Sequence, residues 1–474
     1  MNADDRTEQL RRLKREAAQT GGPERIAARR RKGAGSARER VVRLLDADTF
    51  VELDVFVDGA VTGHGKVNGR DVYIFSQDGE VLQRTLSDAF GAKLVKVIDL
   101  AMKNGAPIVG LYDCGSSTDS RAALGAYSEL FFRNVMASGV VPQIAAVMGA
   151  CPGAGAFSPA LADFTIMIKG SSLLYLGTPE SAATSDEGEF AFEELGGART
   201  HAEKSGVAHL AADDEEECLE MIRTLLSYLP ANNLDVPPRL AVSDPADRMD
   251  EELVTLGAVD PDETYDVRDV IEHVVDGGEF FEMSPWWAEN LVTGFARLAG
   301  RAIGVVGNQP SKLEGRLDLG AAAKAARFVR FCDSFNIPLV TFVDTPGFVG
   351  GTEQEHAGVL RGAAKLVYAY CEATVPKLTL VTHKAYGEGF EIMCSKHIRA
   401  DFNFAWPAAE ISSEVPLGAL DRQDLGSPFD AALAGHLDDI IEPVETRLRL
   451  ISALEACASK REGRPPKKHG NIPL

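Results

Sequence analysis

The feature that most constrains this chain of 474 residues is that its second half repeats its first. Four landmarks recur in the same order at nearly the same spacing, which chance does not readily produce. Lys93, Pro107, Asp113 and Pro142 reappear as Lys324, Pro338, Asp344 and Pro376. Because the chain is also too long for one hydrophobic core, we expect two tandem copies of one domain.

Within each half, apolar runs of strand length alternate with helical patterns. The runs are 72–75, 108–111 and 144–147 in the first half, and 303–306, 339–343 and 378–381 in the second. This alternation predicts an α/β fold, with sheets covered by helices. Proline and asparagine cluster at 229–238, where hydrophobicity drops. We therefore expect a helical segment over 1–46, a first domain over 47–235 and a second over 236–474.

Charge and cysteine usage exclude several classes of function. The net charge of −21 disfavours nucleic acid as the main partner, because phosphate binding needs a basic face. The basic stretch 6–43 is better explained as an amphipathic helix packing on a neighbour than as an RNA-binding arm. None of the seven cysteines forms a C-x-x-C pair, so no metal site is predicted. With no signal peptide and no long apolar run, a soluble cytoplasmic protein without membrane contact is expected.

The candidate chemical sites are two Gly-x-Gly turns at equivalent positions, each following an apolar strand. Gly153-Ala154-Gly155 (the first elbow) and Gly387-Glu388-Gly389 (the second elbow) each begin eleven residues after a landmark proline. Glycines at a strand-to-helix turn let a ligand approach the backbone and expose N–H groups to it. Two such N–H groups form an oxyanion hole for an enolate. A single turn of this kind would more often be structural, but the duplication favours function.

Other candidates are weaker. His356 and His383 are possible bases, although lone histidines are more often structural or exposed. The sequence contains neither a phosphate-binding P-loop nor a dinucleotide fingerprint, so it gives no indication of ATP binding.

Over nearly its whole length the sequence resembles the carboxyltransferase β subunits of biotin-dependent acyl-CoA carboxylases, of the propionyl-CoA type. The resemblance rests on short stretches spread along the chain. In the first half they are ARER (37–40), FVELD (50–54), FSQD (75–78), EELGGARTH (193–201) and SGVAH (205–209). In the second half they are KAARFVR (324–330), DTPGF (344–348), ATVPK (373–377) and AWP (405–407).

The resemblance implies two tandem crotonase-like (ββα-spiral) domains in a homohexamer whose active sites are shared between paired subunits. It implies an acyl-CoA thioester on the first domain, and on the second a carboxybiotin carried by a partner biotin carrier protein and charged by a biotin carboxylase. No tightly bound cofactor is implied. The first oxyanion hole maps onto Gly153 and Ala154, and the second onto Glu388 and Gly389. The implied substrate contacts are Cys114, Gly115, Ser116, Phe157, Gly387, Glu391, Gln83 and Arg84.

The sequence departs from the family pattern where ligands are expected to bind. Gln83-Arg84 replaces a Gly-Gly pair, and CGSST at 114–118 replaces a Ser-Gly-Gly-Ala-Arg loop. The second elbow reads Gly-Glu-Gly instead of Gly-Gly-Ala, and a helical stretch after Pro407 is missing. Three interpretations stay open: a carboxyltransferase with an altered acyl substrate, a biotin-independent decarboxylase of a malonyl-type or β-keto carboxylate, and a non-catalytic paralogue that assembles with an active subunit.

Overall fold

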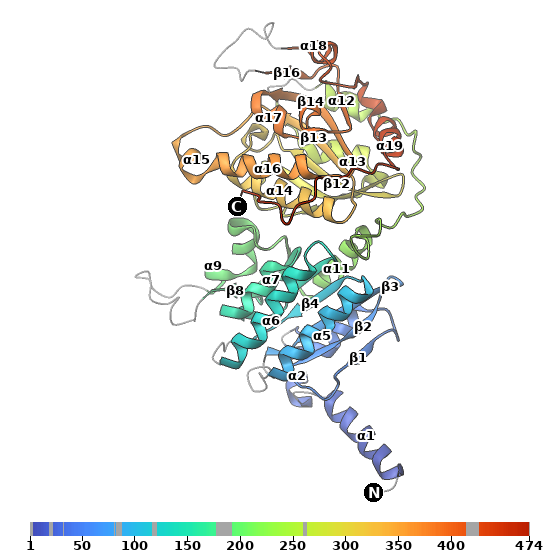
Figure 1. Cartoon of the computed structure of the whole chain (residues 1–474), viewed down its shortest axis with the longest axis vertical. Helices are drawn as coiled ribbons and strands as arrows, with labels where there is room; N and C mark the ends of the chain where they lie inside the picture. Colours follow the sequence, from blue (N-terminus) through green and yellow to red (C-terminus); the bar gives the residue numbers. More distant parts are fainter. Residues whose placement is uncertain are drawn as a thin grey trace. The chain divides into compact units, whose positions relative to one another are not determined.

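The computed structural model describes residues 3–18, 22–31, 33–79, 81, 88–115, 121–176, 192–258, 263–413 and 426–473. Gln83, Arg84 and Ser116 lie outside these ranges. The chain divides into two compact units, Met1–Asp235 and Val236–Leu474. Each unit has its own sheet (Figure 1). Each also has its own cluster of buried hydrophobic side chains.

The first unit is built on a seven-stranded sheet in the order β1-β2-β3-β4-β5-β7-β9. The strands are β1 (Val51–Leu53), β2 (Ala60–Val67), β3 (Arg70–Gln77), β4 (Ile108–Tyr112), β5 (Gln143–Val147), β7 (Phe164–Ile168) and β9 (Leu210–Ala212). The two pairs among β1, β2 and β3 are antiparallel, and every later pair is parallel. Parallel pairs need crossover connections, which the intervening helices supply.

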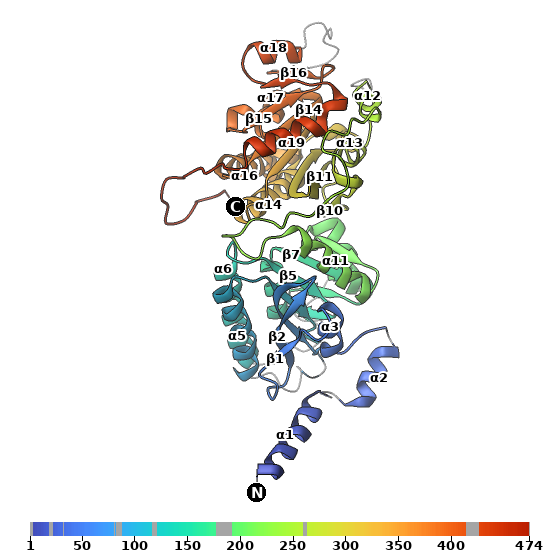
Figure 2. The same ribbon diagram turned by 90° about the vertical axis from the view of Figure 1, so that its right-hand side faces the viewer.

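Helices cover both faces of this sheet. Helices α5 (Asp88–Asn104) and α6 (Arg121–Ala137) lie on one face, and α3 (Ala37–Leu44) and α11 (Glu215–Tyr228) on the other (Figure 2). Shorter helices are α7 (Phe157–Leu161), α9 (Phe192–Gly196) and α10 (Ala198–Thr200). The unit begins with α1 (Ala3–Ala18) and α2 (Pro23–Arg31). Ser36 and Glu39 form a capping box that fixes the start of α3.

The second unit repeats this topology in the order β10-β11-β12-β13-β14-β15-β17, with β16 paired to β14. Its strands are β10 (Phe281–Met283), β11 (Leu291–Leu298), β12 (Arg301–Asn308), β13 (Leu339–Thr345), β14 (Lys377–Tyr386), β15 (Phe402–Ala405), β16 (Glu410–Ser412) and β17 (Asp439–Ile440). Its helices are α12 (Glu252–Gly257), α13 (Val267–Val274), α14 (Leu319–Ser334), α15 (Thr352–Ala357), α16 (Val359–Glu372), α17 (Gly387–Ile392), α18 (Pro428–Leu433) and α19 (Thr446–Ala456).

The lysine and proline landmarks of the sequence repeat make equivalent contacts in both units. The carbonyls of Pro107 and Pro338 accept the N–H groups of Tyr73 and Gly304 at 2.9 and 2.8 Å. The buried ammonium of Lys93 donates to the carbonyls of Val57 and Ala60. Lys324 does the same for Ser284, Trp287 and Leu291. In each unit a buried lysine thus ties a crossover helix to the antiparallel strands, so the predicted α/β duplication is confirmed.

Among the described residues, none of the helices combines the length and the apolar character that crossing a membrane requires. Nor do the described side chains of His, Cys, Asp and Glu include a group of three or more placed to hold a metal ion.

Candidate active site

The first elbow lies where a short strand turns into a helix. Strand β6 (Ala150–Pro152) pairs with β8 (Leu173–Tyr175) and leads into a 3₁₀ turn, Gly153–Ala156, which continues as α7. Gly153 has a φ of 55°, a left-handed conformation that glycine adopts without steric cost. Because the first N–H groups of a helix have no intrahelical acceptor, this turn can offer backbone donors to a ligand.

Cys114 lies beneath the first elbow and supports it. A Cβ atom added to Gly155 would come within 2.9 Å of the Cys114 sulfur, so the elbow packs directly on this thiol. The thiol is almost fully buried and donates to Oε1 of Gln77 at 3.2 Å. Gly115 follows with a φ of 74°. Cys114 was predicted to contact substrate, and in this structure its thiol forms part of the floor under the turn.

Asp113, at the end of β4, is held by two arginines. Its Oδ2 accepts from Arg29 at 2.7 Å and from the fully buried Arg40 at 3.3 Å. Arg40 also pairs with Glu215 at 2.6 Å. A Cβ atom on Gly149 would come 2.5 Å from the Asp113 carboxylate, so only glycine fits there. The residue next to Cys114, on which the first elbow packs, is therefore part of a network of ion pairs.

The second elbow has the same backbone. Strand β14 leads into α17, and Gly387 has a φ of 51°, matching Gly153. A Cβ atom on Gly389 would come 2.8 Å from Cα of Gly347, just as Gly155 is pressed against Cys114. By position, the counterpart of the Gly153–Ala154 pair is thus Gly387–Glu388, one residue before the Glu388–Gly389 pair inferred from the sequence.

The support behind the second elbow differs from that behind the first. Asp344, the counterpart of Asp113, accepts the backbone N–H of Lys384 at 3.1 Å, and its other oxygen lies 3.6 Å from Nδ1 of His383. The hydroxyl of Tyr265 lies 3.2 Å from that nitrogen and 2.9 Å from the Thr382 hydroxyl. Asp344, His383 and Tyr265 are all buried.

Burial shifts the titration of this group. It raises the pKa of Asp344 to about 6, although the Lys384 ammonium and the Lys384 N–H act in the opposite direction. Burial, aided by the Lys384 charge, lowers the pKa of His383 to about 4. With that pKa the imidazole is neutral near pH 7 but only weakly basic, and it is almost fully buried, so His383 is a poor candidate for the general base considered from the sequence.

The predicted side chains near the elbows are exposed. Phe157 begins α7 with 47% of its surface accessible. Glu388 and Glu391 lie on α17, are exposed, and form no ion pair with the described residues. In the first unit the fold thus brings Cys114, Gly115 and Phe157 to the first elbow, and in the second unit it brings Glu391 to the second. His356 is exposed on α15.

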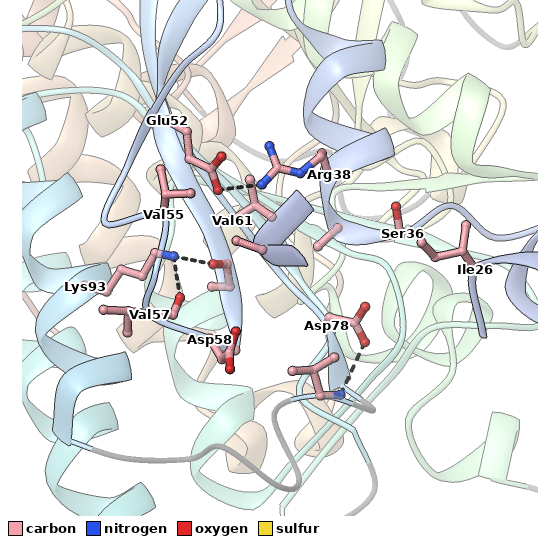
Figure 3. Close-up of a pocket in the computed structure, with 15 residues that line it drawn as sticks. Ile26, Ser36, Arg38, Glu52, Val55, Val57, Asp58, Val61, Asp78 and Lys93 are labelled. Carbon is pink, nitrogen blue, oxygen red and sulfur yellow. Dashed lines mark hydrogen bonds and ion pairs between the residues drawn. The ribbon is translucent and has the colours of Figure 1, made fainter. Parts of the chain in front are cut away.

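A small pocket in the first unit contains neither elbow (Figure 3). Its wall carries Lys93, whose ammonium is bound by two carbonyls, and an ion pair between Arg38 and Glu52 at 2.7 Å. The ammonium and the Arg38–Glu52 pair are thus held by partners within the fold.

Sequence reasoning recorded Asp113 and Asp344 only as repeat landmarks, and it missed Arg29, Arg40 and Tyr265. The available signal was that both aspartates directly follow a buried parallel strand, at the sheet edge where ligands gather.

Comparison with known proteins decides the family. Residues 28–420 match the family model of the carboxyl transferase domain. The chain belongs to the carboxyl transferase family. It is 45% identical to the propionyl-CoA carboxylase carboxyltransferase subunit of Haloferax mediterranei, over 100% of both chains. It is 44% identical to the methylmalonyl-CoA decarboxylase subunit alpha of Veillonella parvula, over 96% of both.

A solved structure supports the same assignment. Transcarboxylase 12S, described as a hexamer and solved with methylmalonyl-coenzyme A bound, superposes with a TM-score of 0.96 at 39% identity, covering 100% of this carboxyl transferase and 99% of that chain. The predicted crotonase-like carboxyltransferase fold is thereby confirmed. The alignment with the Haloferax subunit spans 516 positions against 474 residues here, so this chain lacks roughly 40 positions that its relative has.

Proposed function

We propose that this protein transfers a carboxyl group between carboxybiotin and the α-carbon of an acyl-CoA thioester. The observation that carries the proposal is the pair of elbows, each opened by a left-handed glycine at an equivalent position. This transfer needs two oxyanion holes. One stabilises the enolate of the acyl thioester, and the other stabilises the negative oxygen of the carboxyl donor.

The first elbow would hold the thioester carbonyl. When carboxybiotin releases its CO₂, the biotin anion left behind would take the proton of the α-carbon. Charge would then move onto the thioester oxygen, where the N–H groups of Gly153 and Ala154 would stabilise it. One such donor contributes about 3 kcal/mol, or a rate factor of about 10² to 10³. Because the turn is fixed by Cys114 below it, the donors need no reorganisation during the reaction.

The second elbow would receive the biotin ureido oxygen. Bound carboxybiotin would supply the carboxyl group, and Gly387, Glu388 and Gly389 offer the backbone donors of an anion hole. The backbone fits this group, whereas the Glu388 carboxylate adds a negative charge at its entrance.

The acyl substrate we propose is of the propionyl-CoA or methylmalonyl-CoA class. The support is that the two relatives and the superposed structure are named for these thioesters. Glu391 is the residue we propose to contact the acyl pocket, by its position four residues after Gly387.

We further propose a hexamer built from dimers, working in the cytoplasm with a biotin carrier protein and a biotin carboxylase. Five large apolar side chains on α6 and α7, next to the first elbow, support this assembly. They are at least 39% exposed in the single chain: Phe132, Val135, Met136, Phe157 and Leu161. Apolar exposure on this scale is typical of a surface that a partner subunit covers.

A second candidate is decarboxylation of a malonyl-type thioester without biotin. Glu388 favours it, because a carboxylate at the second elbow opposes the negative charge that the biotin oxygen must carry. Decarboxylation uses the enolate hole of the first elbow alone.

The test is turnover of an acyl-CoA panel by the full-length protein. Propionyl-CoA should be carboxylated when carboxybiotin is supplied. In the reverse direction, methylmalonyl-CoA should transfer its carboxyl group to free biotin. Loss of CO₂ at the same rate without biotin would establish the decarboxylase instead. Failure of every thioester, together with stable binding to an active subunit, would establish the non-catalytic paralogue.

A further inference from the structure

Strand β14 carries a bulge immediately before the second elbow. Pairing with β13 runs in register to Val343 and Val381, and resumes at Thr345 and Ala385. Between these points β13 has one residue, Asp344, and β14 has three, Thr382 to Lys384. Extra residues in a bulge lose their ladder partners, and bulges are common where a strand must aim residues at a site.

On the side that faces β13, side chains replace the lost backbone partners; on the other side Lys384 pairs with Glu410 of β16. The Asp344 carboxylate accepts the N–H of Lys384 at 3.1 Å. The Thr382 hydroxyl donates to the Val343 carbonyl at 3.2 Å and lies 2.9 Å from the Tyr265 hydroxyl. The His383 ring packs on Tyr265, with 4.9 Å between ring centroids. Each of the three bulge residues is therefore fixed from the side, and only two residues separate the last of them from Gly387.

We propose that Asp344 is a positioning residue for the second elbow, setting the direction of its backbone donors by holding the β14 bulge. This inference rests on the proposed function for its catalytic consequence, but its structural content does not depend on turnover. Asp344 is 2% exposed and lies behind the turn, so it acts through the backbone and does not touch the substrate.

The charge of Asp344 makes this support dependent on pH. A hydrogen bond to an ionised acceptor is about twice as strong as one to a neutral acceptor. The charged and titratable groups around Asp344 are Lys384 and His383 on β14, Tyr265 before α13, and Glu410 on β16. Burial raises the pKa of Asp344 to about 6. Support for the elbow should therefore weaken as the pH falls below about 6.

The experiment compares Asp344→Asn and Asp344→Ala in the full-length protein. The asparagine keeps an oxygen that can accept the Lys384 N–H but cannot ionise, whereas alanine removes the acceptor. Amide hydrogen exchange over 384–392 should rise about ten- to a hundredfold in Asp344→Ala at pH 7.5, and by less in Asp344→Asn, whose neutral oxygen still accepts the N–H but more weakly. Exchange over 153–161, at the first elbow, is the internal control and should not change.

Activity supplies the second readout, with methylmalonyl-CoA as carboxyl donor and free biotin as acceptor. In wild type, kcat/KM for biotin should fall as pH drops below about 6, and this limb should vanish in Asp344→Asn. The KM for methylmalonyl-CoA should be the same in all three proteins. Unchanged exchange over 384–392 in Asp344→Ala, or an acid limb retained in Asp344→Asn, would overturn the positioning role. Absence of turnover in wild type would instead refute the proposed function. The hydrogen-exchange result would then decide the positioning role of Asp344.

Discussion

The two elbows share a backbone but rest on different chemistry. Gly153 and Gly387 have nearly the same φ, and Gly155 and Gly389 are both pressed against the loop after the neighbouring strand. Behind the first elbow a carboxylate is paired with two arginines. Behind the second, the equivalent carboxylate lies among a neutral histidine, a tyrosine and a backbone N–H. The two units therefore share the backbone of the turn but differ in the side chains that surround the carboxylate behind it.

The difference follows from one pair of equivalent positions. Gly149 has no side chain, so the Arg40 guanidinium can approach Asp113 beside it. Its counterpart His383 carries a ring at that place, and the ring packs on Tyr265. The second elbow therefore has a support in which Asp344, with its pKa raised to about 6, can titrate.

The largest expected effect comes from adding bulk at the glycines that open the turns. Gly153→Val forces a β-branched residue into a left-handed conformation and blocks the donors, so kcat should fall by about 10³. Gly387→Val should do the same on the biotin side. The measurement is steady-state turnover, with circular dichroism as the folding control. Wild-type kinetics in either variant would show that its elbow is not a site.

The second largest effect should come from removing a supporting side chain, and its cost in unfolding free energy should differ between the two units. Arg40→Met leaves the Asp113 and Glu215 carboxylates buried without their central cation, and should destabilise the first unit by about 3–5 kcal/mol. His383→Gln, at the matching place in the second unit, removes no charge at pH 7.5 and should cost about 1 kcal/mol. Urea unfolding at pH 7.5 measures both. Equal losses would mean that the two supports are equivalent after all.

The pH dependence of stability should reveal the second support directly. A raised pKa means that the Asp344 contribution is present below about pH 3.8 and is lost as the pH rises through about 6. A lowered pKa means that the His383 contribution is present above about pH 6.5 and is lost as the pH falls through about 4. The two contributions act over the same range with opposite sign, so in wild type they nearly cancel.

Removing either group should make the pH-dependent contribution of the other measurable. Between pH 6.5 and 4.5, His383→Gln should gain up to about 3 kcal/mol in unfolding free energy relative to wild type, and Asp344→Asn should lose a similar amount. Urea unfolding across this range, expressed as the difference from wild type, cancels all other titrating groups. Two variants that follow the wild-type curve would mean that neither group is perturbed.

Local sequence patterns predicted the fold and the elbows, because those features lie in short stretches. A strand, a Gly-x-Gly turn and a repeated proline can each be found by inspection, and their recurrence fixes the topology. The supports could not be found in this way. Arg29 meets Asp113 across 84 residues, and Tyr265 meets His383 across 118. Such pairs depend on how the sheet brings distant segments together, and no local pattern contains that information.

Glu388 gives the smallest and sharpest test of the comparison, because Ala154 occupies its place in the first elbow. A buried carboxylate about 4 Å from a developing anion would oppose it by about 4 kcal/mol, or roughly a thousandfold in rate. Glu388 is exposed, however, and in a water-like dielectric the same repulsion is only about 1 kcal/mol. Glu388→Gln removes the charge at nearly constant size, and Glu388→Ala recreates the first elbow. Both should therefore raise biotin-dependent carboxylation of propionyl-CoA about fivefold, with more gain at low salt because exposed charges are screened. A thousandfold gain would mean that assembly buries Glu388, and no gain at any salt concentration would remove its support for the decarboxylase.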